Sequence, residues 1–124
     1  MGYQVLVVED DNFLRTVYAT KLTKAGFTIE IATDGIEALE LLKTFIPDII
    51  LLDLIMPRKD GFSTLEDIKK QENLRNIPVI ITSNLGQQEE IDRVMAMGAT
   101  DFITKSNLSL NDLIDKINET VASK

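Results

Sequence analysis

Residues 49–53 read Ile-Ile-Leu-Leu-Asp, a short run of large apolar side chains that ends in a carboxylate. Such a run, apolar at every position, is typical of a strand covered on both faces, as in a parallel sheet. Residues 5–8 and 79–81 have the same character, whereas residues 28–32 alternate between apolar and polar, as an edge strand does. Residues 102–103 give a shorter fifth run. These runs predict the strands of one parallel sheet.

Between these runs, apolar residues recur at the spacing of amphipathic helices. The helical segments are predicted at residues 14–25, 38–45, 62–68, 91–95 and 110–121. Gly26 and Gly98 are expected to end two of these helices, and the pairs Asp34/Glu37 and Ser109/Asp112 to cap two others. Strict alternation of strands and helices predicts an α/β fold, a doubly wound five-stranded parallel sheet with helices on both faces.

Length and composition predict a single soluble domain over residues 3–122, without an output domain in this chain. The sequence has 124 residues, of which 44% are hydrophobic and 27% charged, as in ordinary globular proteins. The net charge of −7 argues against direct binding to nucleic acid or to an anionic membrane. No apolar stretch is long enough to span a bilayer, and no signal peptide opens the chain, so we expect a cytoplasmic protein.

The chain contains no cysteine and no histidine. These two absences exclude disulfides, zinc fingers, thiol nucleophiles and every catalytic arrangement that uses an imidazole. A bound metal would need oxygen ligands, which favours magnesium or calcium over zinc or copper.

In a doubly wound sheet, ligands bind beyond the carboxyl ends of the strands. There the sequence places Glu9, Asp10, Asp53, Ser83 and Lys105. Taken singly, each is more simply explained as a helix cap, a turn residue or a solvated lysine. Three carboxylates brought together are different, because they repel one another unless a cation lies among them. A magnesium ion is the simplest such cation.

Four short sequence motifs along the chain are informative when they are taken together. They are Val7-Val8-Glu9-Asp10-Asp11, Asp53-x-x-Met56-Pro57-x-x-x-Gly61, residues 78–83 and Gly98-Ala99-x-Asp101-Phe102-Ile103-Thr104-Lys105. Together they resemble the receiver domain of two-component response regulators, with the single-domain chemotaxis type as the nearest architecture. The resemblance covers residues 4–121 and implies a flavodoxin-like (βα)5 fold with strand order 2-1-3-4-5.

The resemblance also implies a role for each matching residue. Asp53 would be the phosphoacceptor, Lys105 the phosphate-binding lysine, Ser83 the switch hydroxyl and Phe102 the aromatic switch residue. Without the resemblance, Phe102 would be a plain core aromatic. The implied cofactor is Mg²⁺, and its ligands would be Asp10, Glu9 through water, Asp53 and the backbone carbonyl of Ile55.

The implied partners are a histidine kinase or histidine-containing phosphotransfer protein as donor, and a downstream protein target or separate effector. The surface of the fourth helix, fifth strand and fifth helix would either bind that target or form a homodimer. The protein would be a self-phosphorylating and self-dephosphorylating switch, not a multi-turnover enzyme. Two alternatives remain: a pseudo-receiver that is never phosphorylated, and a flavin mononucleotide carrier, which the acids after the first strand disfavour.

Three residues depart from the family pattern. One is Ile55, whose change is harmless if only its backbone carbonyl binds the metal. Ser106 stands where the family usually has proline, so residues 106–108 are expected to take a different shape. Asn84 stands where a smaller residue is commoner. We expect its bulk to change how water or a partner reaches the phosphoryl group.

Overall fold

The computed structural model describes residues 2–84, 86–107 and 109–123. These residues form one parallel sheet in the order β2-β1-β3-β4-β5, which confirms the predicted topology. The strands are β1 (Gln4–Val8), β2 (Thr28–Ala32), β3 (Ile49–Asp53), β4 (Val79–Ser83) and β5 (Asp101–Thr104). The last strand is longer than the predicted residues 102–103, because Asp101 and Thr104 also pair with β4.

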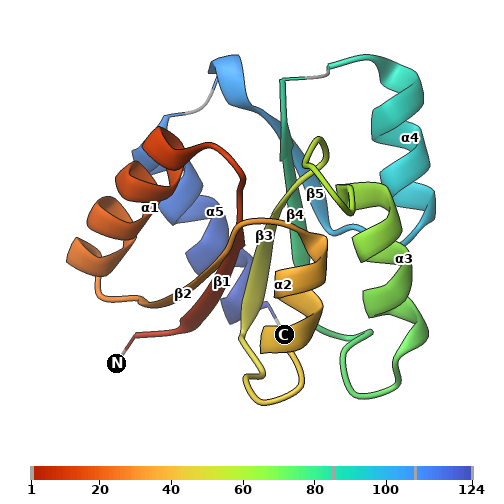
Figure 1. The fold of residues 1–124 in the computed structure, drawn as a ribbon. Coiled ribbons are helices and arrows are strands. Elements are labelled where there is room, and N and C mark those ends of the chain that lie inside the picture. Colours follow the sequence, from red (N-terminus) through yellow and green to blue (C-terminus); the bar gives the residue numbers. More distant parts are fainter. Residues whose placement is uncertain (1, 85, 108, 124) are drawn as a thin grey trace.

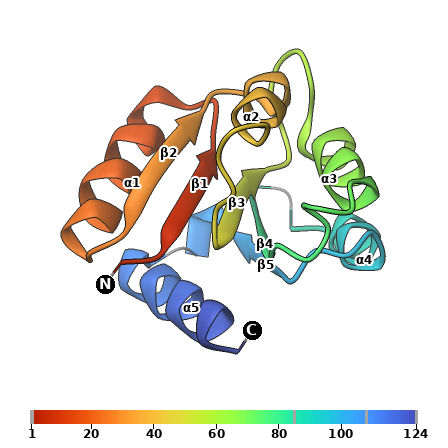
Figure 2. The same cartoon turned by 90° about the horizontal axis from the view of Figure 1, so that it is seen from below.

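Helices cover both faces of the sheet. They are α1 (Asn12–Lys24), α2 (Gly35–Leu41), α3 (Gly61–Lys70), α4 (Gln88–Ala96) and α5 (Leu110–Ala122), with a 3-10 turn, η1 (Lys105–Asn107), after β5. Figures 1 and 2 show α1 and α5 on one side of the sheet, hereafter the α1–α5 face, and α2, α3 and α4 on the other, the α2–α4 face. None of the helices within the described residues is long and apolar enough to cross a membrane.

The central strands supply two separate cores because their side chains alternate between the faces. In β3, Ile49 and Leu51 pack into the α1–α5 core, whereas Ile50 and Leu52 pack into the α2–α4 core. By the same alternation, Asp53 follows Leu51 onto the α1–α5 face. This alternation determines on which face each residue of the carboxyl rim lies.

The predicted helix ends are largely confirmed. Gly26 and Gly98 have φ of 99° and 104°, the left-handed conformation that favours glycine after a helix. The Asp34 carboxylate accepts a hydrogen bond from the Glu37 amide at 2.9 Å, and Ser109 Oγ accepts one from the Asp112 amide at 3.4 Å.

The second helix is shorter than predicted, and in the fourth helix not every apolar residue of the predicted segment 91–95 faces the sheet. The second helix ends at Leu41. It is followed by a turn in which the amides of Lys43 and Thr44 donate to the carbonyl oxygens three residues earlier. Phe45 therefore lies beyond the helix, although it still packs against the α2–α4 core. In α4, Val94 is fully buried but its neighbour Met95 is 43% exposed. The reason is that successive residues of a helix project in different directions, so the side chain after Val94 points away from the sheet.

Candidate functional site

The carboxyl ends of β1, β3, β4 and β5 surround one pocket of about 340 Å³. Its lining is mainly acidic or polar and consists of Glu9, Asp10, Asp11, Leu14, Asp53, Ile55, Ser83, Asn84 and Lys105. The structure therefore brings together every residue that the sequence placed at this rim. Phe102, the predicted aromatic switch residue, is not among the lining residues.

Strand register places three polar side chains in one row on the α1–α5 face. Val8 pairs with Leu52, and Asp53 pairs with Thr82. The Glu9 amide extends the ladder by donating to the Ala32 carbonyl at 3.0 Å. Glu9, Asp53 and Thr82 thus form the last row above an apolar core, where backbone hydrogen bonds hold their positions.

Glu9, Asp10 and Asp53 form a carboxylate cluster. Each offers one oxygen, and these oxygens all lie within 4.8 Å of one another. Glu9 and Asp53 are buried, whereas Asp10 is exposed at the mouth of the pocket. Such a set of oxygen ligands with an open side suits magnesium, which keeps several waters and uses few protein carboxylates. The residues present therefore fit a magnesium ion.

Lys105 is the cation that contacts the two buried carboxylates. Its Nζ lies 2.8 Å from Glu9 Oε1 and 3.2 Å from Asp53 Oδ2. Burial acts to lower the pKa of Lys105, but the contacts with Glu9 and Asp53 outweigh burial and raise it. The ammonium group therefore stays charged and bridges the two acids.

The Asp53 carboxyl is strongly perturbed. Burial and the charge of Glu9 raise its pKa to about 7, although Lys105 opposes the shift. When no metal ion is bound, a large fraction of Asp53 therefore carries a proton near neutral pH. A divalent ion at the cluster would favour the ionised form, which is the nucleophilic one.

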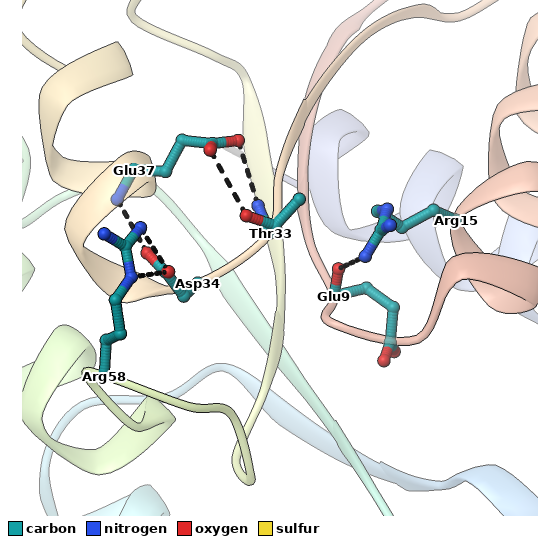
Figure 3. Close-up of polar contacts among 6 residues, drawn as sticks. All are labelled: Glu9, Arg15, Thr33, Asp34, Glu37 and Arg58. Carbon is teal, nitrogen blue, oxygen red and sulfur yellow. Dashed lines mark hydrogen bonds and ion pairs between the residues drawn. The ribbon is translucent and has the colours of Figure 1, made fainter.

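The loop between β1 and α1 is held by hydrogen bonds to its own backbone. Arg15 Nη1 donates to the carbonyl oxygens of Glu9 and Asp10, at 3.1 and 2.7 Å, and Figure 3 shows the bond to Glu9. The Asp11 amide donates to Glu9 Oε2 at 3.1 Å, and the Asp11 side chain caps α1 by accepting from Leu14. These bonds fix the direction of the Glu9 carboxylate.

Ser83 and Phe102 have the opposite orientation from the carboxylates. Ser83 is fully buried and lines the pocket at the end of β4, two residues after Ile81 in the α2–α4 core. Phe102 pairs with Ile81 in the register and packs, half-buried, against the same core. The two predicted switch residues therefore share the α2–α4 face.

The other two departures from the family pattern, Asn84 and Ser106, lie at the same rim as Ile55. Asn84 is exposed and lines the pocket. Ser106 belongs to η1, directly after Lys105. Ser106 and Asn107 thus lie in a 3-10 turn, whereas Leu108 lies outside the described residues. The altered shape of residues 106–108 relative to the family stays a prediction.

Tyr18 was not anticipated at the site. The sequence places it on the buried face of α1, where it is 1% exposed and packs in the α1–α5 core. Its hydroxyl lies beside the Thr82 side chain, which acts to lower the pKa of Tyr18, but the contact does not have the geometry of a hydrogen bond, and no other described residue pairs with the hydroxyl. Burial and the nearby charges of Glu9 and Asp53 raise the pKa of Tyr18 far above its usual value. The only sign of this in the sequence is that tyrosine carries a polar hydroxyl, whereas the other residues on this face of α1 are apolar.

We expect Tyr18→Phe to stabilise the protein by about 1 kcal/mol, because a buried hydroxyl without a partner costs roughly that much. Urea unfolding at neutral pH measures the change. Tyr3→Phe, at the other tyrosine of the chain, is the matched control and is expected to have little effect. A clear loss of stability in Tyr18→Phe would show that the hydroxyl has a partner.

Comparison with known sequences identifies related proteins. The family model described as the response regulator receiver domain matches residues 5–118. The chain is 38% identical over 106 residues to the chemotaxis protein CheY of Thermotoga maritima, covering 85% of this chain and 87% of that protein. It is 32% identical over 117 residues to the Regulator of RpoS of Escherichia coli, covering 94% of this chain but only 34% of that protein. The chain thus spans about a third of that relative.

Solved structures of receiver domains are also similar to this chain. The receiver domain of the Francisella response regulator 1452 is 35% identical, with a TM-score of 0.91 over 98% of both chains. The receiver domain of a sensor histidine kinase from Pseudomonas aeruginosa is 27% identical, with a TM-score of 0.89 over 98% of this chain and 99% of that one. That structure holds a magnesium ion coordinated in the active-site cleft.

Proposed function

The chain belongs to the response regulator receiver family of two-component signalling, and from this membership we propose that Asp53 accepts a phosphoryl group. The donor would be a phosphohistidine on a histidine kinase or phosphotransfer protein, and the reaction would depend on Mg²⁺. The observation that carries the proposal is the placement of Asp53 beside the Lys105 ammonium and two further carboxylates in an open pocket.

The residues of the chain have distinct tasks in this reaction. An Asp53 oxygen attacks phosphorus, the new O–P bond forms, and the N–P bond to the donor histidine breaks with its electrons left on the imidazole. Phosphoryl transfer places charge on the phosphoryl oxygens, so positioning and charge neutralisation account for most of the catalysis. Lys105 supplies positive charge beside Asp53, and Ser83 supplies a hydroxyl donor at the pocket wall.

Glu9, Asp10, Asp53 and the backbone carbonyl of Ile55 would hold the magnesium ion. The support is the carboxylate cluster itself, together with Ile55 in the pocket lining. The bound ion supplies further positive charge to the phosphoryl oxygens during transfer.

Phosphorylation would be read on the surface of α4, β5 and α5. An acyl phosphate carries about two negative charges at the rim, by analogy with other phosphorylated side chains, where the ionised carboxylate carried one. Ser83 would turn toward this group and Phe102 would turn inward, which changes the α4–β5–α5 surface. That surface would bind a downstream target or form a homodimer. We propose that the protein acts as a cytoplasmic switch that phosphorylates and dephosphorylates itself, rather than as a multi-turnover enzyme.

The direct test uses a small-molecule donor. The protein is incubated with acetyl phosphate and Mg²⁺, and intact mass spectrometry measures the addition of one phosphoryl group. We expect the adduct in the wild type, and none in Asp53→Asn or in the presence of a chelator. Absence of the adduct from the wild type would favour the alternative of a pseudo-receiver that signals by protein contact alone.

Asn84 is expected to control the lifetime of the phosphoryl group. It is exposed at the mouth of the pocket, so its bulk limits how water approaches Asp53. We expect Asn84→Ala to change the rate of phosphoryl loss several-fold, about 1 kcal/mol in barrier height. The decay of the phosphorylated mass after donor removal measures this rate, and identical lifetimes in the two proteins would contradict the role.

A further inference from the structure

The loop between β3 and α3, residues 54–60, contains the only non-glycine residue with positive φ among residues 2–84, 86–107 and 109–123. This residue is Arg58, at φ of 63°. The Lys59 amide donates to the Pro57 carbonyl at 2.6 Å, which closes a γ-turn of the rare, positive-φ form around Arg58. Such backbone strain persists only where the surroundings hold it, and it often marks a functional site.

The Arg58 side chain is held by a buried acid on another element. Its Nε and Nη2 both lie 2.5 Å from Asp34 Oδ2, and Figure 3 shows the guanidinium against this carboxylate at the start of α2. Asp34 is 4% exposed, and its other oxygen accepts the Glu37 amide that caps α2. Both oxygens of the acceptor are therefore fixed, and the arginine is bound to a rigid point.

A second contact joins the same two segments. The Gly35 amide donates to the Lys59 carbonyl at 3.3 Å. A Cβ at Gly35 would lie 2.9 Å from that oxygen and 1.9 Å from Thr64 Oγ1, so only glycine permits this approach. The start of α2 and the γ-turn are thus packed backbone against backbone.

The strained turn lies just beyond Ile55, the residue whose carbonyl is assigned to the metal. Leu54 and Met56 bury their side chains in the α2–α4 core, which leaves Ile55 between them at the pocket, 56% exposed. The core therefore fixes the first half of the loop. The contacts with Asp34 and Gly35 fix its second half.

We propose that the Arg58–Asp34 ion pair positions the β3–α3 loop so that the Ile55 carbonyl is held toward the magnesium ion. Arg58 is then a positioning residue, which acts through Ile55 without touching the metal or the phosphoryl group. The proposal rests on the proposed function, because it presumes that the acidic pocket binds Mg²⁺. By this proposal, a residue at the start of α2 also helps to hold the metal site in place.

The test uses two variants that break the ion pair from opposite sides. Arg58→Ala removes the guanidinium, and Asp34→Asn removes the charge while keeping a side chain that caps helices equally well. Arg75→Ala, at an exposed arginine, changes the net charge as Arg58→Ala does and serves as the control. Arg58→Gly removes the pair and also relieves the strain, because glycine tolerates positive φ.

The first measurement is made without metal. We expect amide hydrogen exchange at Gly35 and Lys59 to become about tenfold faster in Arg58→Ala and Asp34→Asn, as the local opening becomes easier. Unchanged exchange at both amides would overturn the claim that the ion pair holds the loop. This measurement does not depend on the proposed function.

The second measurement is the Mg²⁺ dissociation constant, by calorimetric titration with MgCl₂. We expect about tenfold weaker binding in Arg58→Ala and Asp34→Asn, as is usual when a residue supporting a metal ligand is removed. Phosphorylation by acetyl phosphate at saturating Mg²⁺ should stay within about twofold of wild type, because the reacting groups are intact. We expect Arg58→Gly to bind as weakly as Arg58→Ala, and Arg75→Ala as tightly as wild type.

Wild-type affinity in both Arg58→Ala and Asp34→Asn would overturn the positioning role, since the buried Leu54 and Met56 would then suffice to place Ile55. Wild-type affinity in Arg58→Gly alone would also overturn it, because strain relief and not the ion pair would then decide binding. Failure of the wild type to bind Mg²⁺ at all would instead overturn the proposed function, and the positioning role with it.

Discussion

Asp53→Asn is expected to stabilise the metal-free protein by about 2 kcal/mol at pH 8. Asp53 is buried beside Glu9, and burial together with that charge raises its pKa from 3.8 to about 7. A tenfold change in an acid dissociation constant corresponds to ~1.4 kcal/mol, so the cost of ionising Asp53 in the folded state is at most ~4 kcal/mol. The shift to about 7 already includes the opposing contact with Lys105, so the amide of asparagine removes a net cost. We expect about half of this cost to be recovered, because the buried amide must itself be desolvated and hydrogen-bonded.

The pH dependence of this effect has a defined sign. A carboxyl group whose pKa is raised on folding binds its proton more tightly in the folded state, so stability falls as pH rises between the two pKa values. For Asp53 this window runs from 3.8 to about 7. The advantage of Asp53→Asn should therefore be small near pH 4, grow through this window and level off above it.

Urea unfolding between pH 4 and pH 8 in the presence of a chelator measures this profile. Asp115→Asn, at an exposed aspartate of α5, makes the same change in charge and should leave the profile unchanged. Added Mg²⁺ should stabilise the wild type more than Asp53→Asn, because a ligand that binds only the folded state adds its binding free energy to stability. A pH profile with the same slope in wild type and Asp53→Asn would contradict the raised pKa.

Lys105→Met is expected to destabilise the metal-free protein by about 3 kcal/mol at neutral pH. Lys105 is 11% exposed and contacts both Glu9 and Asp53, so its removal leaves two buried carboxylates without a cation. The loss should be smaller near pH 5, because Asp53 is then almost fully protonated, whereas near neutral pH a fraction of it is ionised. Methionine keeps the unbranched side chain, so the change reports the charge more than the packing.

A double-mutant cycle tests whether the effect acts through Asp53. In the Asp53→Asn background only Glu9 remains to be compensated, so Lys105→Met should cost at least ~1 kcal/mol less than in the wild type. Lys24→Met, at an exposed lysine of α1, is the control and should change stability little. Equal losses in both backgrounds would show that Lys105 does not stabilise Asp53.

The fold and the rim residues were predictable because both follow from short-range pattern. Runs such as residues 49–52 identify buried strands, and parallel strands necessarily bring their carboxyl ends to one edge. Glu9 and Asp53 each follow such a run directly, and Lys105 follows the shorter run at residues 102–103 after one residue. Their convergence therefore needed no knowledge of distant contacts. The distances confirm that convergence, whereas the chemical roles of these residues stay predictions.

The features that were not predictable depend on contacts between distant parts of the chain. Arg58 and Asp34 are 24 residues apart, and arginine carries no sequence signal for a positive φ. Tyr18 reads correctly as a core residue, but nothing in the pattern places its hydroxyl below the carboxylates. Periodicity identifies which face of an element is buried, but not which polar atoms meet across the buried space.

The alternation of side chains along β4 also determines which mutations this protein tolerates during evolution. Thr82 faces the carboxylate row and Ser83 faces the opposite core, so inserting or deleting one residue within the strand would exchange their places and disable both. Changes in length are expected instead in the loops at the amino-terminal edge of the sheet, far from the pocket. Point substitutions on the α2–α4 face, by contrast, leave the row of carboxylates on the other face in place.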